Sequence, residues 1–133
     1  MLKELGSKHV MVVHGDDGLD EITISGPTMV AELKHGFVTE FKIEPKQFGL
    51  DIAPIEAIKA KDKEASRGMV LGVLDNQSSP AKDIVMLNAG AAIYVAGIAN
   101  DLWGGVAKAR EMIETGKARA KLDALVKFTS AVQ

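Results

Sequence analysis

The sequence contains no cysteine and no basic surplus. Without cysteine, disulfides and thiolate-ligated zinc sites are excluded, and the composition fits a reducing compartment. Sixteen Lys and Arg stand against 18 Asp and Glu, so the formal net charge is −2. Because proteins that bind the nucleic-acid backbone usually carry a basic surplus, we expect no nucleic acid among the partners.

Long apolar runs and an N-terminal targeting pattern are also lacking. The longest apolar stretch, Ile84 to Ala99, is interrupted by Asn88 and is shorter than the roughly 20 residues of a membrane-spanning helix. The residues from Met1 to Gly6 do not form a basic region followed by an apolar run, so they do not resemble a secretory signal. We therefore expect a cytoplasmic protein that has no membrane partner.

The chain carries enough apolar side chain for one core. It has 133 residues, of which 47% are hydrophobic and 26% charged. This length fits one soluble domain of about 100–150 residues. The apolar content excludes a disordered tail.

An uninterrupted apolar run opens the first half of the chain. It spans Val10 to Val13, is rich in β-branched residues and is followed by Gly15. Such a run is typical of a strand that is covered on both faces, as strands of parallel sheets are. We therefore expect an interior parallel strand. The preceding residues, Leu2 to Ser7, resemble the last turn of a helix that a glycine closes.

From Glu21 to Ile43, apolar residues recur at every second position, which is typical of antiparallel strands. Gly36 allows a positive φ in a short hairpin connection between two of the runs. The pattern predicts a meander of three strands, over Ile22–Ser25, Met29–Leu33 and Phe37–Ile43.

The second half of the chain has helical periodicity. The stretch from Lys82 to Ala99 is apolar nearly all round and rich in small residues, so we expect a central helix that its neighbours approach closely. Capping and turn residues delimit the other helices. Helices are predicted over about Lys63–Leu74, over Lys82–Ala99, between Asp101 and Gly116, and along a final stripe of Leu122, Leu125, Val126 and Thr129. The expected fold class is α/β, with part of a mostly parallel sheet, a three-stranded antiparallel extension and C-terminal helices.

One dense group of acidic residues follows the first predicted strand. In open parallel sheets, ligands bind beyond the carboxyl ends of the strands, and this loop leaves such an end. Clustered carboxylates repel one another unless water or a cation screens them, and all-oxygen ligands suit Mg²⁺. The functional hypothesis is magnesium with a phosphorylated substrate, and the alternative is an acidic surface turn. The four carboxylates belong to Asp16, Asp17, Asp20 and Glu21.

Other polar and aromatic residues are weaker candidates. His14 ends the strand beside the acidic loop, where a structural role is favoured over one toward substrate. His9 and His35 are expected to be exposed. Asn88 lies in an apolar helix, so we expect its amide to hold the backbone of a neighbouring loop. Trp103 is expected in the core rather than at a partner contact. The sequence contains no Gly-rich phosphate loop of the P-loop or dinucleotide type.

Several blocks of this sequence resemble one enzyme family. The segment from Val12 to Ile22, VVHGDDGLDEI, is followed by Gly26-Pro27-Thr28. Together they are similar to the C-terminal half of the anthranilate phosphoribosyltransferases. The resemblance covers essentially all 133 residues in order, and the Gly-Leu-Asp-Glu block with its Gly-Pro-Thr is its most specific part. Further similar blocks are Val30–Leu33, Pro45–Leu50, Asp83–Ala89 and Gly116–Ala118.

The resemblance implies a reaction and a metal site. The family transfers a phosphoribosyl group from 5-phosphoribosyl 1-diphosphate to the amino group of anthranilate, in tryptophan biosynthesis, and releases diphosphate. Its adjacent acidic pair, which falls on Asp20 and Glu21, binds the Mg²⁺ ions that hold the diphosphate. Such ions neutralise charge on the departing group. The implied fold is the catalytic domain shared by nucleoside phosphorylases and phosphoribosyltransferases.

The sequence also departs from the family pattern. The family's Gly-rich diphosphate loop, its Lys-His-Gly-Asn segment, the arginine that contacts anthranilate and the N-terminal helical domain all precede the part matched here. Ala60-Lys61 and Ala65-Ser66 stand where family members commonly have Gly-Gly and Asn-Ala. We therefore expect residues 1–133 to be the C-terminal part of the catalytic domain. It would be inactive alone and would pair with the N-terminal half or with a second copy.

Two alternatives remain open from the sequence. One is a non-catalytic assembly or binding module derived from this fold. The other is a related nucleoside phosphorylase, which would not be expected to carry the Gly-Leu-Asp-Glu block followed by Gly-Pro-Thr.

Overall fold

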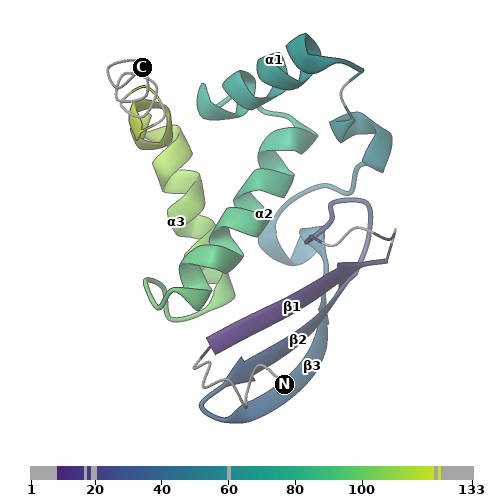
Figure 1. The fold of residues 1–133 in the computed structure, drawn as a ribbon, viewed down its shortest axis with the longest axis vertical. Helices are drawn as coiled ribbons and strands as arrows, with labels where there is room; N and C mark the ends of the chain where they lie inside the picture. Colours follow the sequence, from purple (N-terminus) through teal and green to yellow (C-terminus); the bar gives the residue numbers. More distant parts are fainter. Residues whose placement is uncertain (1–8, 17, 19–20, 60, 122, 124–133) are drawn as a thin grey trace, which may run out of the picture.

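The protein is described here by a computed structural model that covers residues 9–16, 18, 21–59, 61–121 and 123. A three-stranded sheet lies on one side of a group of helices, and α2 stands closest to the sheet (Figure 1). The elements in chain order are β1 (His9–Gly15), β2 (Thr28–Lys34), β3 (Phe37–Ile43), the short 3₁₀ helices η1 (Pro45–Phe48) and η2 (Ile55–Ile58), α1 (Lys63–Leu74), α2 (Pro80–Val95) and α3 (Leu102–Glu114).

The sheet is antiparallel, in the order β1-β2-β3. β1 pairs with β2 from His9 opposite Lys34 to Gly15 opposite Thr28, and β2 pairs with β3 as a hairpin. The hairpin loop consists of His35 and Gly36, with φ of 53° and 81°. Two successive positive φ values characterise the tight turns that match the twist of the flanking strands. The hairpin connection predicted around Gly36 is confirmed.

Two expectations about the strands were wrong in detail. Val10–Val13 does lie in a strand, but in the described part of the chain β1 is antiparallel to β2 and lies at the sheet's edge. Val12 is 55% exposed, so this strand is not covered on both faces. An apolar, β-branched run favours a strand but does not specify the direction of its neighbour.

The segment Ile22–Ser25 is not a strand, and β1 takes its place in the meander. Its backbone groups find partners outside any ladder: Thr23 N–H donates to Thr28 Oγ1 at 3.0 Å. The carbonyl of Ile24 accepts from Ala53 N–H at 3.0 Å. Ile22, Thr23 and Ile24 are buried nonetheless. Their alternating apolar pattern therefore reflects burial of an irregular segment.

Local capping chemistry explains where the helices begin and end. α1 matches its prediction, and Asp62 Oδ1 caps it by accepting from Ala65 N–H at 2.7 Å. α2 begins earlier than predicted because Ser79 Oγ accepts from Lys82 N–H at 3.0 Å and Pro80 occupies the first turn. It ends at Val95, before the predicted Ala99, and is followed by Gly97 with φ of 83°.

α2 is the central helix, as predicted, and α3 crosses it closely. A Cβ built on Gly90 of α2 would lie 2.6 Å from the Val106 Cα of α3. Only glycine allows the two backbones to approach this far. α3 begins after Asp101, whose Oδ1 accepts from Gly104 N–H at 2.6 Å, and Gly116 with φ of 77° follows its end. The final predicted stripe, Leu122, Leu125, Val126 and Thr129, lies outside the described residues.

One hydrophobic core joins the inner face of the sheet, the irregular segment after the acidic loop and the three helices. No helix within the described ranges combines the length and apolar character that crossing a membrane requires. The core includes Ile22, Ile24, Val30, Ile43, Phe48, Leu50, Val73, Ile84, Met86, Leu87, Leu102, Val106 and Ile113.

Candidate functional site

The acidic loop leaves the end of β1. Asp16 N–H donates to the Pro27 carbonyl at 3.0 Å, and Gly18 N–H donates to the Gly15 carbonyl at 2.9 Å. Gly18 has φ of +94°, which a residue with a side chain rarely adopts. The loop therefore turns sharply after the strand, and its two sides are joined by the bond between Asp16 and Pro27.

Of the predicted metal pair, only Glu21 can be placed. Glu21 is exposed, whereas Asp20 and Asp17 of the same loop lie outside the described residues. Asp16 is also exposed. The exposed carboxylate of Glu21 sits directly before a buried stretch of backbone, because Ile22 is only 2% exposed.

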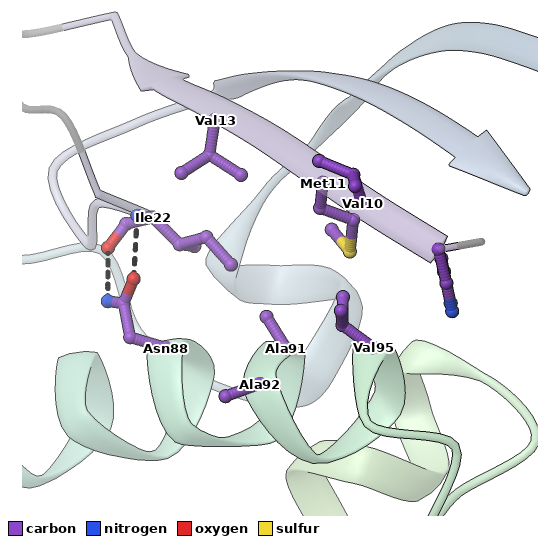
Figure 2. A pocket seen from close by; sticks show the side chains of 9 residues that line it. Val10, Met11, Val13, Ile22, Asn88, Ala91, Ala92 and Val95 are labelled. Carbon is purple, nitrogen blue, oxygen red and sulfur yellow. Dashed lines mark hydrogen bonds between the residues drawn. The ribbon is translucent and has the colours of Figure 1, made fainter. Parts of the chain in front are cut away.

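Asn88 holds that backbone in place. Its Oδ1 accepts from Ile22 N–H at 2.9 Å, and its Nδ2 donates to the Ile22 carbonyl at 2.9 Å. Figure 2 shows both bonds reaching from α2 to the segment beside β1. The expectation that Asn88 binds the backbone of a neighbouring loop is confirmed.

The turn that returns the chain to β2 is buried as well. Thr23 and Thr28 are fully buried, and the Oγ1 of Thr28 accepts from Thr23 N–H. Thr23 Oγ1 also accepts from Ser25 N–H at 3.2 Å. The segment from Thr23 to Thr28, which contains the Gly-Pro-Thr block, is therefore a compact turn closed by two threonine hydroxyls.

The described residues supply one exposed carboxylate of the predicted metal pair, that of Glu21. Among the residues that the structure describes, no three His, Cys, Asp or Glu side chains gather as a metal cage. Magnesium usually takes one or two protein carboxylates and completes its shell with water and substrate phosphates. An exposed glutamate on a fixed backbone suits that mode of binding.

The histidines divide between surface and interior. His35 is exposed in the hairpin loop, as predicted, and His14 is exposed near the end of β1. The expectation that His9 is exposed was wrong. His9 Nε2 lies 2.7 Å from Glu32 Oε2, and its ring meets the Tyr94 ring edge-on at 4.6 Å. The pairing of β1 with β2 brings His9 to this position, and its neighbours in sequence do not reveal it.

Sequence reasoning missed the polar cluster around Glu32. The carboxylate of Glu32 is buried on β2 and accepts a 2.5 Å hydrogen bond from the hydroxyl of Tyr94 on α2. Lys34 Nζ donates to the Tyr94 oxygen at 3.3 Å. Burial, followed by the hydrogen bond to Glu32, raises the pKa of Tyr94 to about 12. The cluster joins β1, β2 and α2 at the end of β1 remote from the acidic loop.

Trp103 was expected in the core but is 54% exposed. Its Nε1 donates to the Gln47 carbonyl at 3.0 Å, and its ring stacks on Phe48 with centroids 5.4 Å apart. Position 103 lies about 100° around the helix from position 102. The buried face of α3 consists of Leu102, Gly105, Val106, Ala109 and Ile113.

An open apolar groove of about 360 Å³ runs between β1 and α2. Figure 2 shows the side chains of Met11 and Val13 pointing from β1 toward α2, and Val10 also lines the groove. The hydrogen-bonded pair of Asn88 and Ile22 stands at one end of this groove. On the α2 side, the groove is lined by Asn88, Ala91, Ala92 and Val95.

Comparison with known proteins gives consistent results. Residues 1–119 match the sequence profile described as glycosyl transferase family, a/b domain. The anthranilate phosphoribosyltransferase of Nitrosomonas europaea is 52% identical over 132 residues, which are 99% of this chain and 39% of that protein. That of Polynucleobacter asymbioticus is 55% identical over 126 residues, 95% of this chain and 37% of the relative.

Solved structures agree with these matches. The Thermus thermophilus anthranilate phosphoribosyltransferase superposes with a TM-score of 0.84 at 36% identity, covering 96% of this chain and 37% of that one. The Saccharomyces cerevisiae enzyme in complex with PRPP and Mg gives 0.78 at 26% identity, covering 91% and 35%. This chain thus spans less than two fifths of the length of these relatives. The expected fold class, an incomplete α/β domain of the phosphoribosyltransferase type, is confirmed.

Proposed function

The chain belongs to the glycosyl transferase family with the a/b domain, and from that premise we propose that it takes part in phosphoribosyl transfer to anthranilate. The donor is 5-phosphoribosyl 1-diphosphate, and the products are N-(5-phosphoribosyl)anthranilate and diphosphate, in tryptophan biosynthesis. The observation that carries the proposal is the 52% identity with an anthranilate phosphoribosyltransferase along almost the whole chain. The lack of cysteine fits a reaction in the reducing cytoplasm.

In this proposal, Asp20 and Glu21 hold Mg²⁺ against the diphosphate of the donor. The bound metal would supply positive charge where negative charge accumulates as the bond from C1 to the diphosphate oxygen breaks. Glu21 is exposed and precedes a buried backbone, so it presents a carboxylate to solvent from a fixed point. The chain's own part in the reaction is therefore to bind and orient the departing group.

The remaining parts of the site are proposed to come from a partner. We propose that residues 1–133 form the C-terminal part of a catalytic domain, which is completed by the N-terminal half or by a second copy. The share of each relative that the chain matches, 37% to 39% among the curated proteins, supports this division. The open groove beside β1 offers apolar surface for such a partner.

Activity should return when the missing part is supplied. The chain can be mixed with the part of the Nitrosomonas europaea relative that it does not match, and anthranilate consumption followed after adding donor and Mg²⁺. We expect turnover from the mixture, none from the chain alone, and a loss in the mixture with Glu21→Gln. Glu111→Gln is the matched control, because Glu111 is exposed on α3.

The outcomes separate the candidate functions. Turnover by the chain alone would contradict its role as an incomplete site, and a rate insensitive to Glu21→Gln would remove the metal role of that residue. A stoichiometric complex on size exclusion that never consumes anthranilate would favour the non-catalytic assembly module.

A further inference from the structure

We infer that Asn88 is a positioning residue for the Glu21 carboxylate, an inference that rests on the proposed function. Asn88 lies on α2, 66 residues away from Ile22 in sequence. It contacts the backbone on the carboxyl side of Glu21. Its role would be to set where the metal-binding glutamate stands relative to the helix.

The amide of Asn88 is fully engaged in this contact. One Nδ2 hydrogen is donated to the Ile22 carbonyl and the other to the Ile84 carbonyl, each at 2.9 Å, while Oδ1 accepts from Ile22 N–H. An asparagine amide has two donors and one acceptor oxygen, so neither end is left to turn elsewhere. The bond to Ile84, one turn earlier on α2, orients the side chain that grips Ile22.

Asn88 on α2 bonds to the backbone of this segment without adding a charge near Glu21. Both polar backbone groups of Ile22 pair with one neutral side chain, as they would with a neighbouring strand. Ile22 is 2% exposed, and Thr23 and Ile24 are fully buried. The backbone beyond Glu21 is therefore immobilised in the core, whereas Glu21 itself faces solvent. The bonds from α2 to Ile22 therefore fix the position of the backbone from which the Glu21 side chain extends.

Loss of the contact between Asn88 and Ile22 should lower the metal affinity of the site while the chain stays folded. Groups that orient metal ligands from behind typically change metal affinity about 10–100-fold when they are removed. Asn88→Leu keeps the approximate size and the charge but removes all three bonds. Asn88→Ser is milder, because a helical serine can still bond to the Ile84 carbonyl but is too short to reach Ile22.

The test uses Mn²⁺ as the probe and backbone amide NMR signals of the 133-residue chain as the readout. Saturable paramagnetic broadening near Glu21 reports the metal, and hydrogen exchange of the Ile22 amide reports the tether. For both Asn88 variants, we expect the half-saturating Mn²⁺ concentration to rise about tenfold and Ile22 exchange to accelerate.

Two control variants give this result its meaning. Ile113→Val trims a buried residue of α3, so it should lower the melting temperature without moving the Mn²⁺ half-saturation. Glu21→Gln should remove the saturable broadening while Ile22 exchange stays slow.

The experiment distinguishes failure of the positioning role of Asn88 from failure of the metal role of Glu21. If wild-type broadening saturates and disappears in Glu21→Gln, but Asn88→Ser keeps the wild-type half-saturation, the positioning role is wrong and the metal role stands. If the wild-type chain shows no saturable broadening, or Glu21→Gln leaves it unchanged, the metal role of Glu21 fails and the inference fails with it.

Discussion

The hydroxyl of Tyr94 donates a 2.5 Å hydrogen bond to the buried carboxylate of Glu32, which joins α2 to β2 across 62 residues of sequence. Glu32 Oε2 also lies 2.7 Å from His9 Nε2, so the same oxygen receives groups from α2 and from β1. A buried carboxylate needs such partners, because charge without them is costly to remove from water. The cluster therefore acts as a polar bridge between the sheet and the central helix.

Tyr94→Phe should destabilise the fold while leaving its shape intact. The substitution removes the hydrogen bond that Tyr94 donates to the buried Glu32 carboxylate and the one that it accepts from Lys34, and we expect the free energy of unfolding to fall by about 1–3 kcal/mol. Urea denaturation measures the change. Thr115→Val is the control, because it removes an exposed hydroxyl bond to the Glu111 carbonyl and should stay within about 0.5 kcal/mol. Equal effects of the two substitutions would argue against the bridge.

Stability should fall at high pH because of the same tyrosine. The pKa of Tyr94 is raised from 10.0 to about 12 by burial and by Glu32, so the folded state holds this proton more tightly than the unfolded chain. This contribution is fully present below pH 10 and is lost as the pH rises toward about 12.

Urea midpoints of the wild type and Tyr94→Phe, compared across that interval, isolate the effect from lysine titration. The gap between the two proteins should shrink as the pH rises. A gap that stays constant would contradict the raised pKa.

The crossing of α2 and α3 should not tolerate alanine at Gly90. A Cβ there would lie 2.6 Å from Val106 Cα, and a Cβ on Gly105 would meet the Gly90 carbonyl. Forcing the helices apart should lower the free energy of unfolding by about 1–3 kcal/mol. Thermal or urea unfolding of Gly90→Ala checks this.

Gly68→Ala on α1 is the matched control, since nothing lies within 4 Å of its added methyl. It should stabilise the protein by about 0.5–1 kcal/mol, because alanine loses less backbone entropy in a helix. A destabilising Gly68→Ala, or a neutral Gly90→Ala, would show that helix spacing does not limit these positions.

The alternating pattern of β2 did not reveal which face of the strand is buried. In β2, Met29, Ala31 and Leu33 alternate with Val30 and Glu32, and the first set is the more apolar. The structure buries both Val30 and Glu32, whereas in the more apolar set Leu33 is buried but Met29 is 43% exposed. Periodicity shows that two faces exist, but the partner that covers one of them decides which is inside.

For the candidate site too, the sequence indicated the residues but not their contacts. The Gly-Leu-Asp-Glu block pointed to Asp20 and Glu21, and an asparagine in an apolar helix implied that its amide has a partner. That the partner is Ile22, directly beside Glu21, required the folded chain. The metal role of the pair stays a prediction.

The sequence by itself determined the features that depend on contacts within about four residues. These are the helices that begin after Asp62, Ser79 and Asp101 and the tight turn at Gly36. Tertiary structure alone decided the antiparallel partner of β1, the buried bridge of His9, Glu32 and Tyr94, and the exposed place of Trp103. Each of these joins residues at least 13 positions apart in the chain. Such contacts form only when distant elements pack, and no local pattern of side chains encodes which surfaces will meet.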